Sequence, residues 1–168
     1  VLVVRRAGQD LPDLPDGVRV VDDLLPQNAS LGGLYTGLAL APTPWCFLVA
    51  CDMPLLAADL VRWLRDHPGR GDVLMPERDG RVEPMHAVYG HRCLGAIKEA
   101  LLSGELSMRS WHGGVRVTRV PEPAWREVHP SGDSFANANT PEQWAALEAE
   151  SPGERHARLQ RGLVLRPV

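Results

Sequence analysis

Short apolar runs alternate with segments of helical spacing along the first half of the chain. Residues 1–4, 18–21 and 45–50 are rich in Val, Leu and other apolar side chains. Apolar runs bounded by turn residues are typical of strands buried on both faces of a parallel sheet. Residues 31–41 and 56–64 place leucines at helical spacing. The alternation predicts an α/β fold with a parallel, doubly wound sheet.

The second half of the chain keeps this alternation and adds signals for antiparallel strands. The expected elements are strands over 73–75, 82–89 and 115–120, and helices over 94–102 and 141–150. The dipeptide Asp79-Gly80 favours a tight turn before the extended segment. Thr140 and Gln143 have the spacing of a capping box, which predicts a helix start there. The sheet is therefore expected to be mostly parallel, with added antiparallel strands.

The chain is long enough for one domain with a substantial core. It has 168 residues, a net charge of -3 and three cysteines. Residues 1–150 are expected to form that domain, and residues 151–168, which hold four arginines against one acidic residue, form a tail. The charge gives no electrostatic case for a nucleic-acid partner, and no apolar run is long enough to span a membrane. Three unpaired cysteines favour the reducing cytoplasm.

Polar residues with chemical potential follow the predicted strands. Asp23 and Asp52 stand at the carboxyl ends of apolar runs, and Gly32-Gly33 begins a predicted helix. Ligands of open α/β sheets bind outside the carboxyl ends of the strands. Asn137 and Asn139 directly precede the last helix. In a doubly wound sheet these segments can converge on one crevice, where carboxylates hold Mg²⁺ and amides bind a base or ribose edge.

Each of these residues also has a purely structural interpretation. Asp52 could cap the helix that Pro54 is expected to begin, and Asp23 could be a turn residue. Gly32-Gly33 could be a tight junction, and the two asparagines could be turn formers. His86 lies in an extended apolar segment, where a structural role is favoured over a catalytic one.

Four segments together resemble a known family. They are residues 22–23, 30–34, 49–54 and 135–141, and residues 83–89 and 104–108 add to the likeness. In this order and spacing, residues 1 to 150 resemble the molybdenum cofactor guanylyltransferases, which are nucleotidyltransferases with a Rossmann-like fold. The resemblance implies a three-layer α/β architecture. It also implies transfer of GMP from GTP to molybdopterin-bound molybdenum cofactor, which yields the guanine dinucleotide cofactor and pyrophosphate.

The resemblance implies a role for each candidate residue. Asp52 matches the ligand of Mg²⁺, which would screen the triphosphate and stabilise charge on the transferring phosphorus. Asp23 matches a nucleotide-binding aspartate, and Asn137 and Asn139 match residues at the mouth of the crevice. Gly32 and Gly33 would let the backbone approach the nucleotide closely. The implied partners are GTP and the molybdopterin cofactor, and molybdoenzyme maturation proteins are further candidates.

The chain departs from the family in one large respect. The family begins with a strand and the glycine-rich loop Leu-Ala-Gly-Gly-x-Ser-x-Arg-Met-Gly, and no segment of the 168 residues matches that loop. An incomplete chain or a misplaced start is therefore expected, and the 168 residues alone are expected to be inactive. The alternatives are a molybdenum cofactor cytidylyltransferase, another nucleotidyltransferase, or a non-catalytic nucleotide-binding partner in molybdoenzyme maturation.

Overall fold

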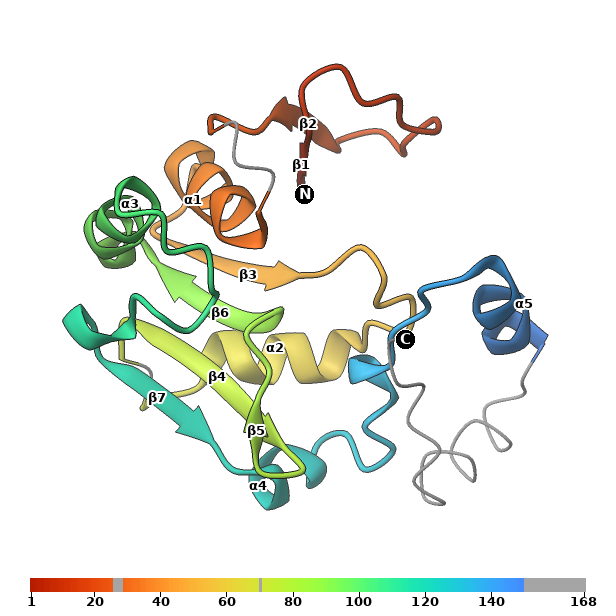
Figure 1. Ribbon diagram of the computed structural model, residues 1–168. Coiled ribbons are helices and arrows are strands. Elements are labelled where there is room, and N and C mark those ends of the chain that lie inside the picture. The colour runs from red at the N-terminus through yellow and green to blue at the C-terminus, as the bar shows by residue number, and fades with distance from the viewer. Residues whose placement is uncertain (26–28, 70, 150–168) are drawn as a thin grey trace. The chain divides into compact units, whose positions relative to one another are not determined.

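The computed structural model describes residues 1–25, 29–69 and 71–149 and has the mixed α/β architecture drawn in Figure 1. The strands are β1 (Leu2–Arg5), β2 (Arg19–Asp22), β3 (Trp45–Val49), β4 (Val73–Arg78), β5 (Arg81–Val82), β6 (His86–Gly90) and β7 (Val117–Val120). The α-helices are α1 (Ser30–Leu40), α2 (Ala58–Asp66), α3 (Leu94–Leu102), α4 (Glu122–Arg126) and α5 (Pro141–Ala149). Short 3₁₀ turns are η1 (His91–Cys93), η2 (His112–Gly114) and η3 (Asp133–Phe135). The α/β prediction is confirmed, whereas residues 151–168 lie outside the described part of the chain.

The strands form two sheets. β1 and β2 pair in parallel, with Leu2 opposite Arg19. The larger sheet has the order β3-β6-β4-β5, and β7 also pairs with β4. β1 and β2 are parallel, whereas β4 pairs antiparallel with both β5 and β6. The prediction of an α/β fold with parallel strands and added antiparallel strands is confirmed.

A tight hairpin joins β4 to β5, as the dipeptide Asp79-Gly80 predicts. Both residues have positive φ, 50° for Asp79 and 72° for Gly80. Two such residues form the turn that matches the twist of antiparallel strands. The flanking Arg78 and Arg81 are register partners.

The chain divides into two compact units. The first comprises Val1–Leu48, Gly69–Leu74 and Val88–Thr118. The second comprises Val49–Pro68, Met75–Ala87 and the chain from Arg119 onward. The expectation of one domain over residues 1–150 stays a prediction.

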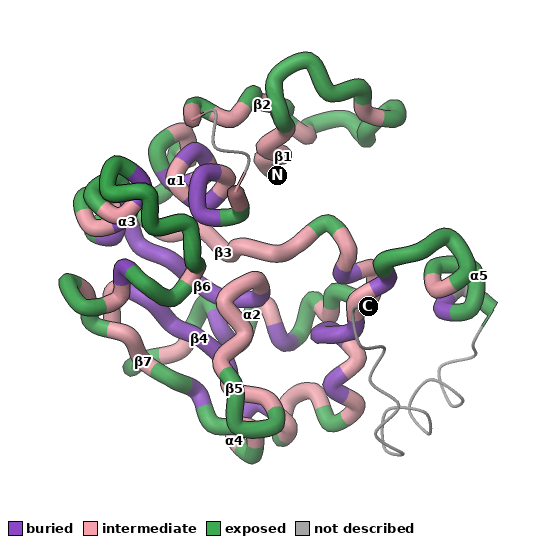
Figure 2. Tube along the Cα trace, viewed as in Figure 1, coloured by how far each residue is buried: buried purple, intermediate pink, exposed green. Residues whose placement is uncertain are grey.

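In the first unit, helix α1 supplies much of the core. Leu31, Leu34 and Leu38 are almost completely buried, as is Ile97 of α3. Their spacing of three and four residues puts the leucines on one face of the helix. The purple stretches of α1 and α3 in Figure 2 mark this core.

In the second unit, aromatic side chains form the centre of the core. Phe135 packs between His86 and Trp125, with ring centroids 4.4 and 4.8 Å away. The indole of Trp125 donates a hydrogen bond of 2.8 Å to the backbone oxygen of Glu77. Trp125 lies on α4, a five-residue helix that the sequence pattern did not predict because it is too short for a helical period.

Two expectations for the segment around Asp52 are wrong. β3 was expected to be buried on both faces, but its residues are only half-buried, because the strand stands at one end of the strand order. The following helix was expected to begin near Pro54, but α2 begins at Ala58 with Ala57 as its N-cap. The residues between form turns, and Asp52 is therefore not a helix cap.

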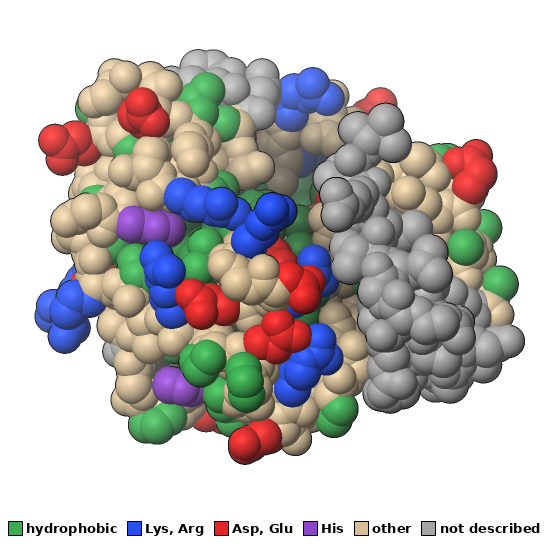
Figure 3. All heavy atoms as spheres, turned by 60° about the horizontal axis from the view of Figure 1, so that its bottom comes forward, with side chains coloured by type: hydrophobic (Ala, Val, Ile, Leu, Met, Phe, Trp, Pro, Cys, Tyr) green, Lys and Arg blue, Asp and Glu red, His purple; other side chains and the backbone are tan. Residues whose placement is uncertain are grey.

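Basic and acidic side chains lie next to one another on the face drawn in Figure 3. Within the second unit, Arg78 is 3.2 Å from Glu83, and Arg119 is 3.4 Å from Glu77. These two arginines are thus compensated by acidic neighbours within the unit. None of the helices in the described ranges is both long enough and apolar enough to cross a bilayer.

Candidate functional site

Asp23 directly follows β2 in the first unit. Its backbone N–H donates to the oxygen of Arg5 at 2.7 Å, which continues the parallel pairing by one residue. Its Oδ1 accepts a hydrogen bond of 2.6 Å from Oγ1 of Thr36 and one of 3.2 Å from the N–H of Leu25. Thr36 is completely buried in α1. The carboxylate is therefore held in a defined orientation, and part of its role is that of the turn residue considered above.

The two glycines at the start of α1 have different surroundings. A Cβ atom at Gly32 would lie 3.1 Å from Oδ2 of Asp23, whereas one at Gly33 would have no neighbour within 4 Å. The first distance is tighter than an ordinary van der Waals contact. The structure thus brings Gly32 and Asp23 together, and the absence of a side chain at Gly32 makes room for the carboxylate.

Asp52 lies in the second unit, in the turn that follows β3. Its backbone oxygen accepts a 2.7 Å hydrogen bond from the N–H of Ala138. Nδ2 of Asn137 donates to its Oδ2 at 3.4 Å. The structure thus brings together Asp52 and Asn137, two of the predicted site residues.

The second carboxylate oxygen of Asp52 differs from the first in its surroundings. Oδ1 is buried and has no hydrogen-bond partner within the described part of the chain. Buried oxygens are normally paired, and a buried unpaired carboxylate oxygen is costly unless a cation or donor meets it. The atom is therefore suited to bind a ligand.

The donor set fits one kind of metal site. Across residues 1–25, 29–69 and 71–149, no three His, Cys, Asp or Glu side chains cluster as a metal site. Mg²⁺ does not need such a cluster, because it is often bound by one or two carboxylates together with waters and substrate phosphates. Asp52 fits the role of that single protein ligand.

Asn139 lies at the start of α5. Its backbone N–H donates to Oε1 of Gln143 at 2.6 Å, and the N–H of Gln143 donates to Oγ1 of Thr140 at 3.2 Å. The predicted capping box is therefore present, with Asn139 in place of Thr140 as the backbone donor. An open pocket of about 500 Å³ adjoins it, lined by Asn139, Thr140, Pro141, Trp144 and Ala145.

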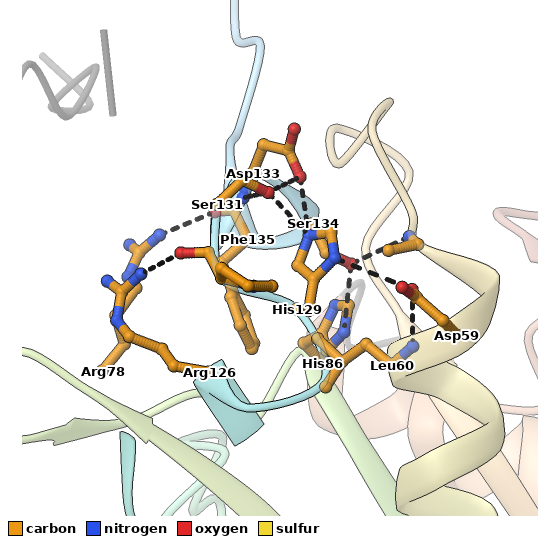
Figure 4. Close-up of polar contacts among 12 residues, drawn as sticks. Asp59, Leu60, Arg78, His86, Arg126, His129, Ser131, Asp133, Ser134 and Phe135 are labelled. Atoms are coloured by element: carbon orange, nitrogen blue, oxygen red, sulfur yellow. Dashed lines mark hydrogen bonds and ion pairs between the residues drawn. The ribbon is translucent and has the colours of Figure 1, made fainter. Parts of the chain in front are cut away.

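Sequence reasoning missed a polar cluster around His129 in the second unit (Figure 4). His129 Nε2 lies 2.6 Å from Oδ1 of Asp133, and Nδ1 lies 3.6 Å from Oδ1 of Asp59. The hydrogen bond with Asp133 raises the pKa of His129 above its ordinary value, and the charge of Asp59 acts in the same direction. The only sequence signal is the spacing of His129, Ser131 and Asp133 at alternate positions.

His86 occupies the buried side of this cluster. Its side chain is completely buried, and Nε2 lies 3.4 Å from Oγ of Ser134. Burial lowers its pKa to about 3, helped by the nearby charges of His129 and Arg78. The imidazole therefore stays neutral at physiological pH, and its structural role stays a prediction.

The MobA-like NTP transferase domain family matches residues 1–119. The chain belongs to this family. A protein of Pelotomaculum thermopropionicum named "Probable molybdenum cofactor guanylyltransferase" is 30% identical over 94% of the chain and 77% of its own length. A protein of Chloroflexus aggregans with the same name is 33% identical over 89% of the chain and 72% of its own length. The predictions of a nucleotidyltransferase family and of an enzyme class are therefore confirmed.

A solved structure supports the same assignment of this MobA-like chain. The molybdopterin-guanine dinucleotide biosynthesis protein A of Archaeoglobus fulgidus superposes with a TM-score of 0.67 and 25% identity. The match covers 77% of the chain and 66% of that protein, so the chain spans about two thirds of its length. The roles of Asp23, Gly32, Gly33, Asp52, Asn137 and Asn139 stay predictions.

The unequal surroundings of the two glycines predict unequal effects of alanine. Gly33→Ala should raise the free energy of unfolding by roughly 0.5–1 kcal/mol, because alanine is the better helix former. Gly32→Ala should show no such increase in the free energy of unfolding, because its methyl group displaces the carboxylate of Asp23. Urea unfolding of both variants measures the difference, and equal stabilisation would show that Asp23 does not need the space.

The buried His86 predicts an acid-sensitive fold. As the pH falls from 6.5 towards 3, the unfolded chain binds a proton that folded His86 does not. This group should therefore reduce the free energy of unfolding by up to about 1.4 kcal/mol per pH unit. Urea unfolding of the wild-type chain and of His86→Gln between these pH values isolates the contribution of His86 to the pH dependence. An unchanged slope in the variant would assign the acid sensitivity to other groups.

Proposed function

We propose that the MobA-like chain provides the nucleotide- and metal-binding residues for transfer of GMP from GTP to molybdopterin-bound molybdenum cofactor. The observation that carries this proposal is the carboxylate of Asp52. Asn137 holds its Oδ2, and its buried Oδ1 has no partner among the described residues. The names of its relatives support nucleotidyl transfer in molybdenum cofactor biosynthesis. The proposed products are the guanine dinucleotide cofactor and pyrophosphate.

Asp52 is the proposed ligand of Mg²⁺. When bound, the ion neutralises triphosphate charge and stabilises the charge that develops on the transferring phosphorus. Ala138 fixes the backbone oxygen of Asp52, and Asn137 fixes one carboxylate oxygen, so the other oxygen keeps a defined direction. Such preorganised groups lower the barrier because they need no rearrangement during the reaction.

Asp23, Asn137 and Asn139 are the proposed nucleotide contacts. Oδ2 of Asp23, which lies beside Gly32, is the oxygen proposed to accept hydrogen bonds from a guanine or ribose edge. The amide of Asn139 lies at an open pocket and can bind substrate there.

The proposed reaction requires no dedicated general base. The attacking phosphate of the cofactor is already ionised at neutral pH. Its oxygen forms a bond to the α-phosphorus of GTP, and the bond to the β-phosphate bridge breaks with release of pyrophosphate. The protein then contributes positioning and electrostatic stabilisation.

The Asp52→Asn variant tests the metal role. Calorimetric titration with GTP in the presence of Mg²⁺ should show binding to the wild-type chain, and the variant should lose at least about tenfold in affinity, since a charged ligand is worth more than about 1.4 kcal/mol. The substitution keeps the shape of the side chain, so the fold should be retained. Thr43→Ala, on a surface hydroxyl of the first unit, is the control. Equal affinities of wild type and Asp52→Asn would contradict the assignment.

Turnover by the 168 residues tests the expectation of inactivity. The purified chain should give no guanine dinucleotide from GTP, Mg²⁺ and molybdopterin cofactor, because it contains no match to the family's phosphate-binding loop. Competition of GTP against CTP in a binding assay separates the guanylyltransferase from the cytidylyltransferase alternative. Clear product from GTP would show that these residues suffice.

A further inference from the structure

The proposed metal ligand depends on a segment far away in sequence. Asp52 contacts the backbone of Ala138 and the side chain of Asn137, 85 residues from Asn137 along the chain. The orientation of Asp52 therefore depends on how firmly the segment from Asp133 to Ala138 is held. Whatever ties this segment to the chain after Asp52 also sets the geometry of the carboxylate.

His129 lies between the two segments. Asp59, in the first turn of α2, follows the turns that begin at Asp52. Asp133 begins the 3₁₀ turn that leads to Asn137. The imidazole contacts Asp59 through Nδ1 and Asp133 through Nε2, and its side chain is only 13% exposed (Figure 4). One ring thus faces a carboxylate from each segment.

Hydrogen bonds on the Nε2 side of the ring hold it and its turn in place. Oγ of Ser131 donates to Oδ1 of Asp133 at 2.8 Å and lies 3.2 Å from Nε2 of His129. Arg126 donates to the oxygen of Pro130 at 2.7 Å. The turn at 129–133 is therefore held by its own side chains as well as by α4.

The charge of the ring decides how many carboxylates it can hold. A protonated imidazole has two N–H groups, and it can donate to Asp59 and Asp133 at once. A neutral imidazole has one N–H group and leaves the other carboxylate facing a lone pair. Protonated His129 therefore connects the segment of Asp59 to that of Asp133, whereas neutral His129 donates to only one of the two carboxylates.

Ser134 and His86 make a second tie that does not depend on charge. The N–H of Ala57 donates to Oγ of Ser134 at 3.0 Å, and Ser134 also contacts His86. Both side chains are fully buried. Since His86 stays neutral, His129 is the titrating element of the cluster.

We propose that His129 is a positioning residue that, when protonated, joins the segment of Asp52 to the segment of Asn137 and so makes nucleotide binding pH-dependent. This inference rests on the proposed function for its link to binding. The groups that face the ring are Asp59 of α2, Asp133 of η3 and His86 of β6. Arg78 of β4 acts on His86, and Arg126 of α4 contacts the neighbouring backbone.

The direction of the effect follows from the raised pKa of His129. Its stabilising contribution is complete below the ordinary pKa of histidine and is lost as the pH rises through the raised value. The contacts of His129 with both Asp59 and Asp133, here called the His129 join, should therefore be strong in mildly acidic solution and weak in alkaline solution. This trend is opposite to that of His86.

Amide hydrogen exchange tests the join without any ligand. The protection factor of the Ala138 N–H, corrected for intrinsic exchange, should fall roughly tenfold as the pH rises from about 6 to about 9, since a hydrogen bond to a charged group is lost. His129→Gln should remove this pH dependence. Asp133→Asn should shift the midpoint to lower pH, because it removes the charge that raises the pKa of His129. His67→Gln, at the end of α2, is the matched control and should behave as wild type.

Binding of GTP with Mg²⁺ tests the consequence. The dissociation constant should rise roughly tenfold over the same pH range in wild type and His67→Gln, and should stay level in His129→Gln. A pH dependence that persists in His129→Gln, in exchange and in binding, would overturn the inference while leaving the proposed function in place. Absence of GTP binding at every pH, with the exchange results as expected, would overturn the proposed function and leave the join itself established.

Discussion

A carboxylate at the end of an apolar strand is the constraint on which the second unit depends. Asp52 follows β3, and its charge must be met by donors or by a cation because one of its oxygens is buried. The amide of Asn137 donates to one carboxylate oxygen, and the N–H of Ala138 holds the backbone oxygen of the same residue. The other carboxylate oxygen has no partner among the residues that the structure describes. The turns before α2 and the turn at η3 are arranged to make these contacts. Two turns that are far apart in the sequence thus orient one charged side chain.

The first unit also contains a carboxylate that a hydrogen bond orients. Asp23 also follows a strand, and a buried hydroxyl, that of Thr36, fixes one of its oxygens. The other oxygen lies beside Gly32, where any side chain would crowd it. In both units a hydrogen bond from the protein fixes one carboxylate oxygen, and the other oxygen is the proposed ligand contact.

Much of the fold could be predicted because apolar periodicity is local. The strand around residues 45–50 and the helix over 31–41 follow from runs and spacings that lie within one element. The start of α2 could not be predicted in this way, because Pro54 is equally suited to a turn and to a first helical position. β3 was expected to be fully buried, but burial depends on a strand's place in the sheet, which its own residues do not encode. The sequence pattern supplied the candidate residues and the family resemblance supplied their expected roles, whereas their partners became visible only in the structure.

The His129 cluster shows why long-range polar contacts escape a reading of the sequence. Asp59 and His129 are 70 positions apart, and nothing local to either residue indicates the other. The turn after α4 leads into the aromatic core around Phe135, and the N–H of Ala57, the N-cap of α2, donates to the neighbouring Ser134. Rigid packing of that core fixes the backbone on both sides, so a change at one imidazole acts on geometry that cannot relax freely. The protonation of His129 can therefore influence Asp52 without touching it, and a neutral replacement that fits the same space should remove the influence while preserving the core.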